Sequence, residues 1–173
     1  MRRAAGIILL GGLACLLTAA SCDGGKSPTG PASPADTTTQ GSGVTAMEME
    51  TLVQQSIPGQ GGGTVREVVR DPAAWAALWA DLREGSALPE TPPAVDFSRD
   101  MVIAAAMETQ PCVSRVTIRS AVETGGELVI NILEAPPAPN CICITSERPI
   151  HAVRLRKVDA PARFDVEQGQ THC

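Results

Sequence analysis

The chain has 173 residues, of which 43% are hydrophobic, and its formal net charge is -5. This length suits one globular domain with accessory segments and a single well-buried core. The negative charge repels nucleic acid and anionic lipid headgroups. Only Trp75, Trp79, Phe97 and Phe164 are aromatic, so there is no platform for stacking bases or sugars. Composition therefore argues against a nucleic-acid-binding protein and predicts a mostly aliphatic core.

The first 21 residues have the pattern of an export signal. Two arginines follow Met1, Ile7 to Leu17 is apolar, and small residues at 19–21 precede Cys22. The apolar stretch is too short to span a bilayer stably. The pattern resembles the lipobox of bacterial lipoproteins, which implies cleavage before Cys22, diacylglycerol on the Cys22 sulfur and firm anchoring by several acyl chains. The alternative is ordinary secretion with cleavage nearby.

A linker and a folded domain follow this signal. Residues 22–44 comprise the lipidated cysteine and a stretch rich in Gly, Ser, Thr and Pro, with almost no large apolar side chain to bury. As a coil this stretch would span roughly 25 Å. The globular domain is therefore expected over residues 45–173. Removal of residues 1–21 takes away Arg2 and Arg3 and leaves 12 Lys and Arg against 19 Asp and Glu, or -7.

The folded part is expected to begin with a strand. From Met47 to Ile57 apolar residues recur at odd positions, which is the period of a half-buried strand. Pro58 and a glycine cluster at 59–63 then break the chain, and residues 64–69 are predicted to return as the second strand of a hairpin. The alternative, a phosphate-binding loop, lacks the Lys-Ser/Thr that should follow the glycines.

One amphipathic helix follows. Asp71 is a suitable N-cap and Pro72 suits the first helical position. One helical stripe then carries Trp75, Leu78, Trp79 and Leu82, at i, i+3, i+4 and i+7. Gly85 and a proline-rich loop end the helix. We expect both tryptophans to pack on the sheet.

The stretch from Val95 to Met107 contains the predicted central strand. After Asp100, seven residues follow without a polar side chain, which suits a strand covered on both faces better than a helix of ten or more residues. The helical alternative rests on the intrinsic propensity of Ala104, Ala105 and Ala106.

Short strands follow to the C-terminus. Alternating patterns run from Cys112 to Val122 and again from Leu128, and a three-residue loop at 124–126 lets even positions face even positions. That register places Cys112 opposite Ala138, three residues short of Cys141. Further strands are expected at 141–145, 150–155 and 163–166. The predicted fold class is α+β and mainly β, an antiparallel sheet of about seven short strands with one amphipathic helix packed on it.

Several of these segments together resemble the C-terminal domain family of PrcB, a protease-complex subunit. They are DPAAWAALW, VDFSRDMVIAAAM, GGELVINI, a proline-rich loop and RPIHAVRL, within roughly residues 65–157. The resemblance implies an exported, often lipid-anchored protein that associates with a surface protease and stabilises it. It implies no catalytic residues. The chain departs from the family pattern at 107–112, where glycines and a tyrosine would be expected.

Four cysteines remain beyond Cys22 in the exported chain. An even number in an oxidising compartment predicts two disulfides. The register favours Cys112 with Cys141, which leaves Cys143 for Cys173. A direct Cys141 to Cys143 bond is the poorest pairing, because residues two apart on one strand lie at the edge of the permitted Cα separation.

Reactive alternatives use the same atoms. The thiolates could bind zinc with His151 or His172, but Cys-x-Cys is not the usual zinc-ligand spacing. A redox pair or a Cys-His nucleophile lacks Cys-x-x-Cys and an assignable base. We expect His151 to be a half-buried structural residue and His172 to be solvated. No serine triad can be assigned.

The sequence therefore predicts a non-catalytic lipoprotein of the bacterial cell envelope, held to a membrane by its lipid and without a cofactor or metal. Its expected partner is another exported protein, which a stabilising subunit of a protease would bind. The alternative is an inhibitory module that inserts a loop into a protease. The candidate partner loop comprises Glu134, Pro136, Pro137, Pro139 and Asn140.

Overall fold

The computed structural model describes residues 45–58 and 61–172. The predicted signal, the lipid site at Cys22, the linker up to residue 44 and Cys173 lie outside the described residues. The described elements, in chain order, are β1 (Thr45–Ala46), β2 (Met49–Pro58), β3 (Val65–Val69), α1 (Pro72–Leu82), β4 (Asp100–Ala106), β5 (Gln110–Pro111), β6 (Arg115–Thr124), β7 (Glu127–Ala135), β8 (Ser146–Arg156) and β9 (Ala162–Gln168).

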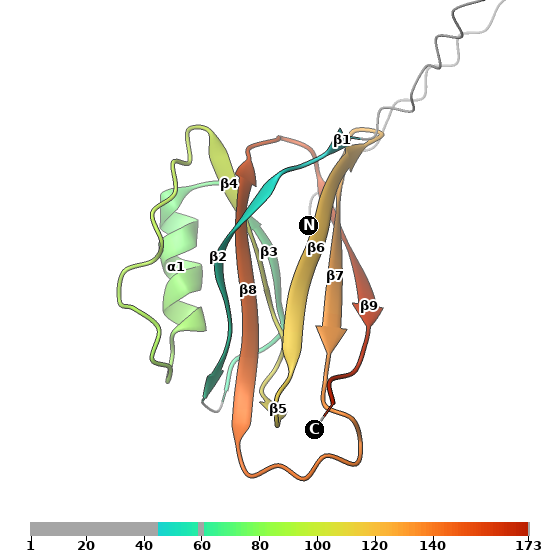
Figure 1. Cartoon of the computed structure of the whole chain (residues 1–173). Coiled ribbons are helices and arrows are strands. Elements are labelled where there is room, and N and C mark those ends of the chain that lie inside the picture. The colour runs from blue at the N-terminus through green and yellow to red at the C-terminus, as the bar shows by residue number, and fades with distance from the viewer. Residues whose placement is uncertain (1–44, 59–60, 173) are drawn as a thin grey trace, which may run out of the picture. The chain divides into compact units, whose positions relative to one another are not determined.

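The strands form two sheets packed face to face, with α1 outside one of them (Figure 1). Sheet A has the order β1-β6-β7-β9, and sheet B has the order β2-β8-β4-β3 with β5 paired to β8. All pairs are antiparallel except β7 with β9, which run parallel. The predicted class, mainly β with one packed helix, is confirmed. The strands divide between two sheets because β6 and β7 bury an apolar face of their own, which needs a second layer to cover it.

The strand β4 lies inside sheet B and is buried on both faces, as predicted. Met101, Ile103 and Ala105 face the cluster between the sheets, whereas Val102 and Ala104 face the cluster under α1. Burial on both sides explains why this segment has no polar alternation. Its helical propensity is overridden by pairing with β3 and β8 on its two edges.

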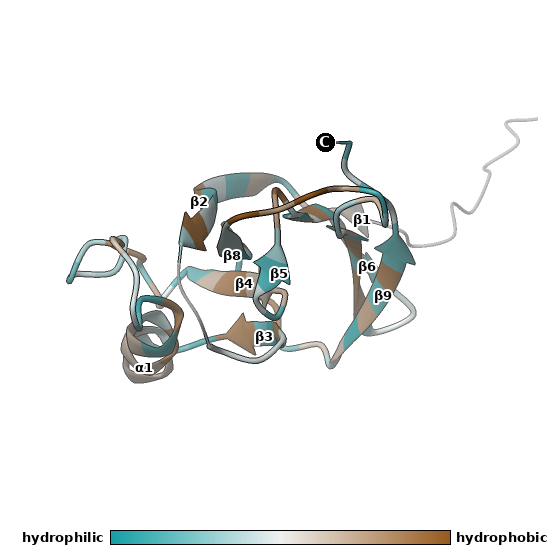
Figure 2. Ribbon diagram, turned by 90° about the horizontal axis from the view of Figure 1, so that it is seen from below, coloured by the Kyte–Doolittle hydropathy of each residue, from teal (hydrophilic) through white to brown (hydrophobic). Residues whose placement is uncertain are grey.

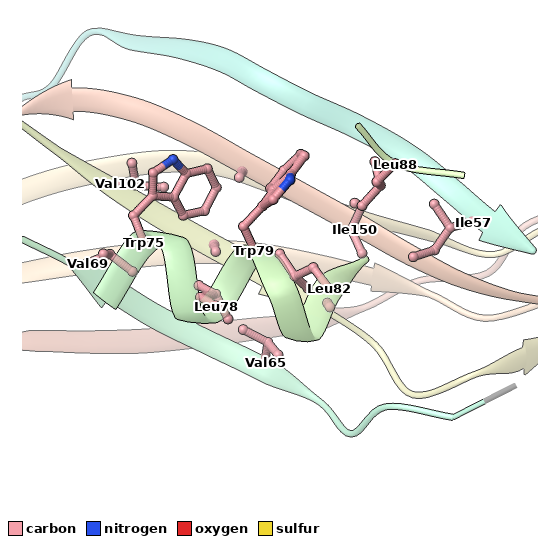
Figure 3. Close-up of a cluster of buried hydrophobic side chains, with 13 residues drawn as sticks. Ile57, Val65, Val69, Trp75, Leu78, Trp79, Leu82, Leu88, Val102 and Ile150 are labelled. Atoms are coloured by element: carbon pink, nitrogen blue, oxygen red, sulfur yellow. The ribbon is translucent and has the colours of Figure 1, made fainter. Parts of the chain in front are cut away.

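The helix is held as the sequence predicts. The Asp71 side chain accepts a hydrogen bond from the Ala74 backbone N–H at 2.8 Å. Figure 3 shows the tryptophans of α1 beside the other apolar side chains of this cluster. The indole N–H of Trp75 donates to Pro93 O at 3.0 Å, and that of Trp79 donates to Pro89 O at 2.9 Å. The proline-rich loop after α1 therefore satisfies the polar atoms of both buried indoles.

The predicted hairpin between the first two long strands is wrong. β2 and β3 lie at opposite edges of sheet B, with β8 and β4 between them. Three strand spacings amount to roughly 14 Å. The seven-residue step from Pro58 to Val65 reaches up to roughly 23 Å when extended, so it crosses the end of the sheet. The described glycines at 61–63 therefore belong to a connection between the two edges of sheet B rather than to a hairpin turn.

Glycine is required in this crossing where the chain passes over a buried arginine. Arg148 is 4% exposed, and its Nη2 donates to Gly63 O at 2.8 Å. Gly62 has φ of 85°, and a Cβ at this position would lie 2.3 Å from the Arg148 guanidinium. Arg148 also reaches Asp81 Oδ2 at 3.4 Å, which ties the crossing to the C-terminal end of α1.

The hairpin of β6 and β7 differs from the prediction in its turn. Thr124 pairs with Glu127, so the loop is the two residues Gly125 and Gly126, both with positive φ. A β-bulge between Ile118 and Ser120 then shifts the register by one residue. Between the bulge and the end of the hairpin, even-numbered residues again pair with even-numbered residues, for example Ile118 with Ile132, as the alternating sequence pattern predicts. It also turns Ala121, rather than Ser120 or Val122, into the core.

In the described part of the chain, no helix has the length and apolar character needed to cross a membrane.

Candidate interaction surface

The loop from β7 to β8 covers one end of the sandwich and passes from sheet A to sheet B. We call residues 136–145 the stapled loop. Figure 2, which looks at this end, shows a hydrophobic part of the loop on the outside of the fold. Residues 141–145 were predicted as a strand, and this is wrong: they form no ladder with either sheet. The stretch is apolar without a strand partner, which makes its surface unusual.

A disulfide fastens this loop to the segment before β6. It joins Cys112 to Cys143, with Cα atoms 5.0 Å apart. The predicted partner of Cys112 was Cys141, so that pairing is wrong. The prediction extended the strand ladder to these residues, whereas the ladder of β6 and β7 ends at Arg115 and Ala135 and residues 141–143 lie outside it.

Cys141 is also disulfide-bonded. Its partner is not among the described residues, and the predicted bond from Cys143 to Cys173 is excluded because Cys143 is bonded to Cys112. The three described cysteines are therefore all oxidised. None of them offers a thiolate for metal binding or nucleophilic attack in this state.

Backbone hydrogen bonds close the loop from both sides. Cys141 N–H donates to Ala138 O at 3.0 Å, and Cys112 N–H donates to Thr145 O at 3.1 Å. At the base of the loop, Thr171 N–H donates to Pro136 O at 2.9 Å and Ala138 N–H donates to Thr171 O at 3.2 Å. Residues 141–145 are thus fixed by the disulfides of Cys141 and Cys143 and by these backbone hydrogen bonds.

This fixed segment presents apolar side chains to solvent. Ile142 is 97% exposed and Ile144 is 99% exposed, and we call this pair the isoleucine tip. Val113, next to the bridged Cys112, is 61% exposed. Burying an exposed isoleucine is worth about 1.5 to 3 kcal/mol. A neighbouring protein that covers the tip would gain this energy without having to order the loop.

A shallow groove of about 440 Å³ lies beside the stapled loop. It is lined by Gln110, Pro111, Pro136, Pro137, Ala138, Pro139, Cys141 and Cys143. Proline, alanine and cystine side chains dominate this lining. The end of the sandwich therefore offers both projecting apolar groups and an apolar recess.

The residues predicted for the partner loop fall into two groups. Glu134 is 8% exposed and lies in β7, where it pairs with Arg66 at 2.7 Å. It holds the fold together rather than facing a partner. Pro136 and Pro137 are half-buried and line the groove, and Pro139 and Asn140 are exposed. The isoleucine tip was missed, because alternation of Cys and Ile was interpreted as a strand with one buried face.

His151 lies in a polar seam between the sheets and not at the stapled loop. Its Nδ1 accepts from Ile118 N–H at 2.8 Å, so the neutral ring carries its proton on Nε2, which lies 3.3 Å from Thr51 Oγ1. Burial lowers the pKa of His151 below its ordinary value. Gln54 reinforces this seam by donating to Val116 O at 3.4 Å. The side chain is 3% exposed, so it is buried rather than half-buried as expected, and its hydrogen bonds join the two sheets.

Within residues 45–58 and 61–172 there is no cluster of three His, Cys, Asp or Glu side chains that could hold a metal ion. Comparison of the chain with protein-family models, with curated proteins and with solved structures found no match.

Proposed function

We propose that this chain is a non-catalytic envelope lipoprotein, anchored through Cys22, whose domain binds another exported protein through the stapled loop. The partner in this proposal is a surface or periplasmic protease, which the bound domain stabilises. The observation that carries the proposal is the isoleucine tip, two almost fully exposed isoleucines on a disulfide-bonded loop. A preorganised apolar surface favours association because little conformational entropy is lost on binding.

Two further observations support this assignment. Disulfides persist in exported proteins and are rare in the cytosol, which agrees with export. The chain also enters the domain at the end opposite the stapled loop (Figure 1). Thr45 pairs with Glu123 at one end of β6, whereas Arg115 pairs with Ala135 at the other, roughly 27 Å away along the strand. Anchoring through the N-terminal segment therefore leaves the loop accessible.

Site-specific photocrosslinking in the native envelope tests the proposal. A photoreactive amino acid at position 144 should form an adduct with one exported protein, and Ile142→Asp should abolish it. The matched control is the same amino acid at Ala77, on the exposed face of α1, which should give no such adduct. Loss of the chain should shorten the lifetime of the captured protein. An adduct with lipid alone, or none, would overturn the proposal.

The anchor has a separate test. Cys22→Ser should move the protein from the membrane fraction to the soluble fraction, because the acyl chains can no longer be attached. A variant that stays in the membrane fraction would show that the tether is not a lipid on Cys22.

A further inference from the structure

Of the four sheet edges in the described part of the chain, three are protected against pairing with another chain, as edges in natural proteins usually are. In sheet B, β3 has only five residues, and the register of β2 is broken by an irregularity. In sheet A, β1 has two residues, and side chains of sheet B bond to the stretch of β6 beyond it. Gln54 donates to Val116 O, and Ile118 N–H donates to His151 Nδ1. The fourth edge is β9.

The edge formed by β9 is long and regular. β9 pairs with β7 over seven residues without a shift in register, and no proline interrupts it. Leu128 N–H donates to Pro161 O and Gly169 N–H donates to Glu134 O, so the odd-numbered residues of β9 bond to β7 in this parallel ladder. The even-numbered residues therefore point their backbone groups away from β7, where the described structure places no other strand. They are Ala162, Phe164, Val166 and Gln168.

The two faces of β9 differ in chemistry. Phe164 and Val166 pack against the cluster between the sheets but are only half-buried, so part of each side chain is exposed at the edge. Alternation along the strand places Arg163, Asp165 and Glu167 on the opposite, outer face. A strand that pairs with β9 therefore meets apolar groups on one face and charges of both signs on the other.

A second copy of β9 fits this edge in one register. An antiparallel pair related by a two-fold axis must set even-numbered residues opposite even-numbered residues, because only these have free backbone groups. A pair centred on Arg163 sets the two arginines opposite each other, and one centred on Asp165 does the same with the two aspartates, which is destabilising. Centring beyond these residues either opposes acidic residues or leaves most of the strand unpaired. Centring on Phe164 sets Arg163 of each copy opposite Asp165 of the other, and no like charges are then opposite.

We propose that two copies of this chain associate through β9, antiparallel and centred on Phe164, so that sheet A continues from one copy into the other. About six backbone hydrogen bonds form, between the two Phe164 residues and between Ala162 and Val166 of opposite copies. The two Phe164 rings meet on the inner face and cover each other's exposed part. Because the paired strands run in opposite directions, the two stapled loops lie at opposite ends of the joined sheet.

Photocrosslinking from position 164 tests this contact in the full-length chain in its native envelope. A photoreactive phenylalanine analogue in place of Phe164 should give an adduct with twice the mass of the chain. Peptide mapping should place the link within residues 162–166 of both copies. The control is the same amino acid at Ala77, on the exposed face of α1, which should give no adduct of this mass.

Charge reversal tests the register. Arg163→Asp sets acidic residues opposite each other and Asp165→Arg sets basic residues opposite each other, so each variant alone should lower the yield of the adduct at least about fivefold. A double variant with both changes should restore the yield, because opposite charges again face each other. Production of the two single variants together should also restore it, as a mixed pair, which shows that each single variant is folded. Arg115→Asp, an exposed charge outside β9, should leave the yield unchanged.

The outcomes decide the proposal without reference to the isoleucine tip, whose partner is captured from position 144. Absence of an adduct of twice the mass from position 164, or a link that maps outside residues 162–166, would overturn the pairing of β9. A yield that neither single reversal lowers would overturn it as well. So would a lowered yield that neither the double variant nor the mixed pair restores.

Discussion

Aliphatic and aromatic side chains are used in opposite ways at two places in this molecule. Under α1, Trp75 and Trp79 are each 2% exposed and pack over the small side chains of Ala104 and Ala106. In the stapled loop the isoleucine tip is almost fully exposed, and covalent bonds replace packing as the source of order. The first region obtains its stability from burial. The second is held rigid so that its apolar groups stay available, and removing them should leave the fold intact.

The largest expected effect is in the region that depends on burial. Trp79→Ala should lower the free energy of unfolding by about 3 to 5 kcal/mol, because it removes a buried ring and leaves a cavity beneath α1. Chemical denaturation monitored by circular dichroism measures the change. Ala77→Ser, on the exposed face of the same helix, is the control and should change stability by no more than about 0.5 kcal/mol. If Trp79→Ala and Ala77→Ser changed the free energy of unfolding equally, the side chains packed under α1 would not be a main source of stability.

The disulfide should have the next largest effect. Replacing Cys112 and Cys143 by alanine together should lower the free energy of unfolding by about 3 kcal/mol, because the bridge closes a loop with a sequence separation of 31 residues and restricts the unfolded chain. The sandwich should still fold, since neither cysteine lies in a strand. Reductant breaks the bond of Cys141 as well, so denaturation of the native chain with reductant should show at least this loss. A native chain indifferent to reductant would contradict the role given to the bridges.

The free energy of unfolding should depend on pH to a smaller extent, because the neutral form of His151 makes the hydrogen bond that joins the two sheets. Its folded-state pKa lies below the unfolded value of about 6.5, so the folded state binds fewer protons than the unfolded state. The stabilisation is therefore complete above about pH 6.5 and declines as the pH falls from there through the folded-state pKa. Denaturation between pH 5.5 and 7.5 should show this decline. In the variant His151→Phe, the free energy of unfolding should no longer decline over this pH range. If it declines as steeply as in the native chain, other titratable groups cause the pH dependence.

The smallest effect on stability should come from the isoleucine tip itself. Ile144→Asp should change the free energy of unfolding by no more than about 0.5 kcal/mol, because a side chain that is 99% exposed loses almost no burial. Thermal unfolding of Ile144→Asp and of Trp79→Ala, measured side by side, should show a clear loss of stability only for Trp79→Ala. A clear destabilisation by Ile144→Asp would mean that the tip packs within the domain, and the proposed surface would then be lost.

Local chemistry was enough to predict the helix and the central strand. Asp71 and Pro72 begin α1, its stripe contains the four buried residues, and β4 is apolar on both faces because both are covered. These features depend on residues within a few positions of one another. The oxidised state of the described cysteines agrees with the disulfides that were predicted from their even number and the expected export signal.

Contacts between distant segments decided the rest. Hydrophobic patterning does not say which strands are neighbours, so β2 and β3 were expected to pair although β8 and β4 lie between them. The two-residue turn shifts the register near the turn of β6 and β7, and the bulge at Arg119 returns it to the predicted one beyond Ile118. The partner of Cys112 and the outward direction of Ile142 both depend on where the loop leaves the ladder. The sequence by itself determined the helix and most of the long strands, because those choices are local, whereas residues 141–145 have a strand pattern but no strand partner. Only the tertiary structure decided which apolar residues are buried and which are presented, since burial depends on what lies opposite.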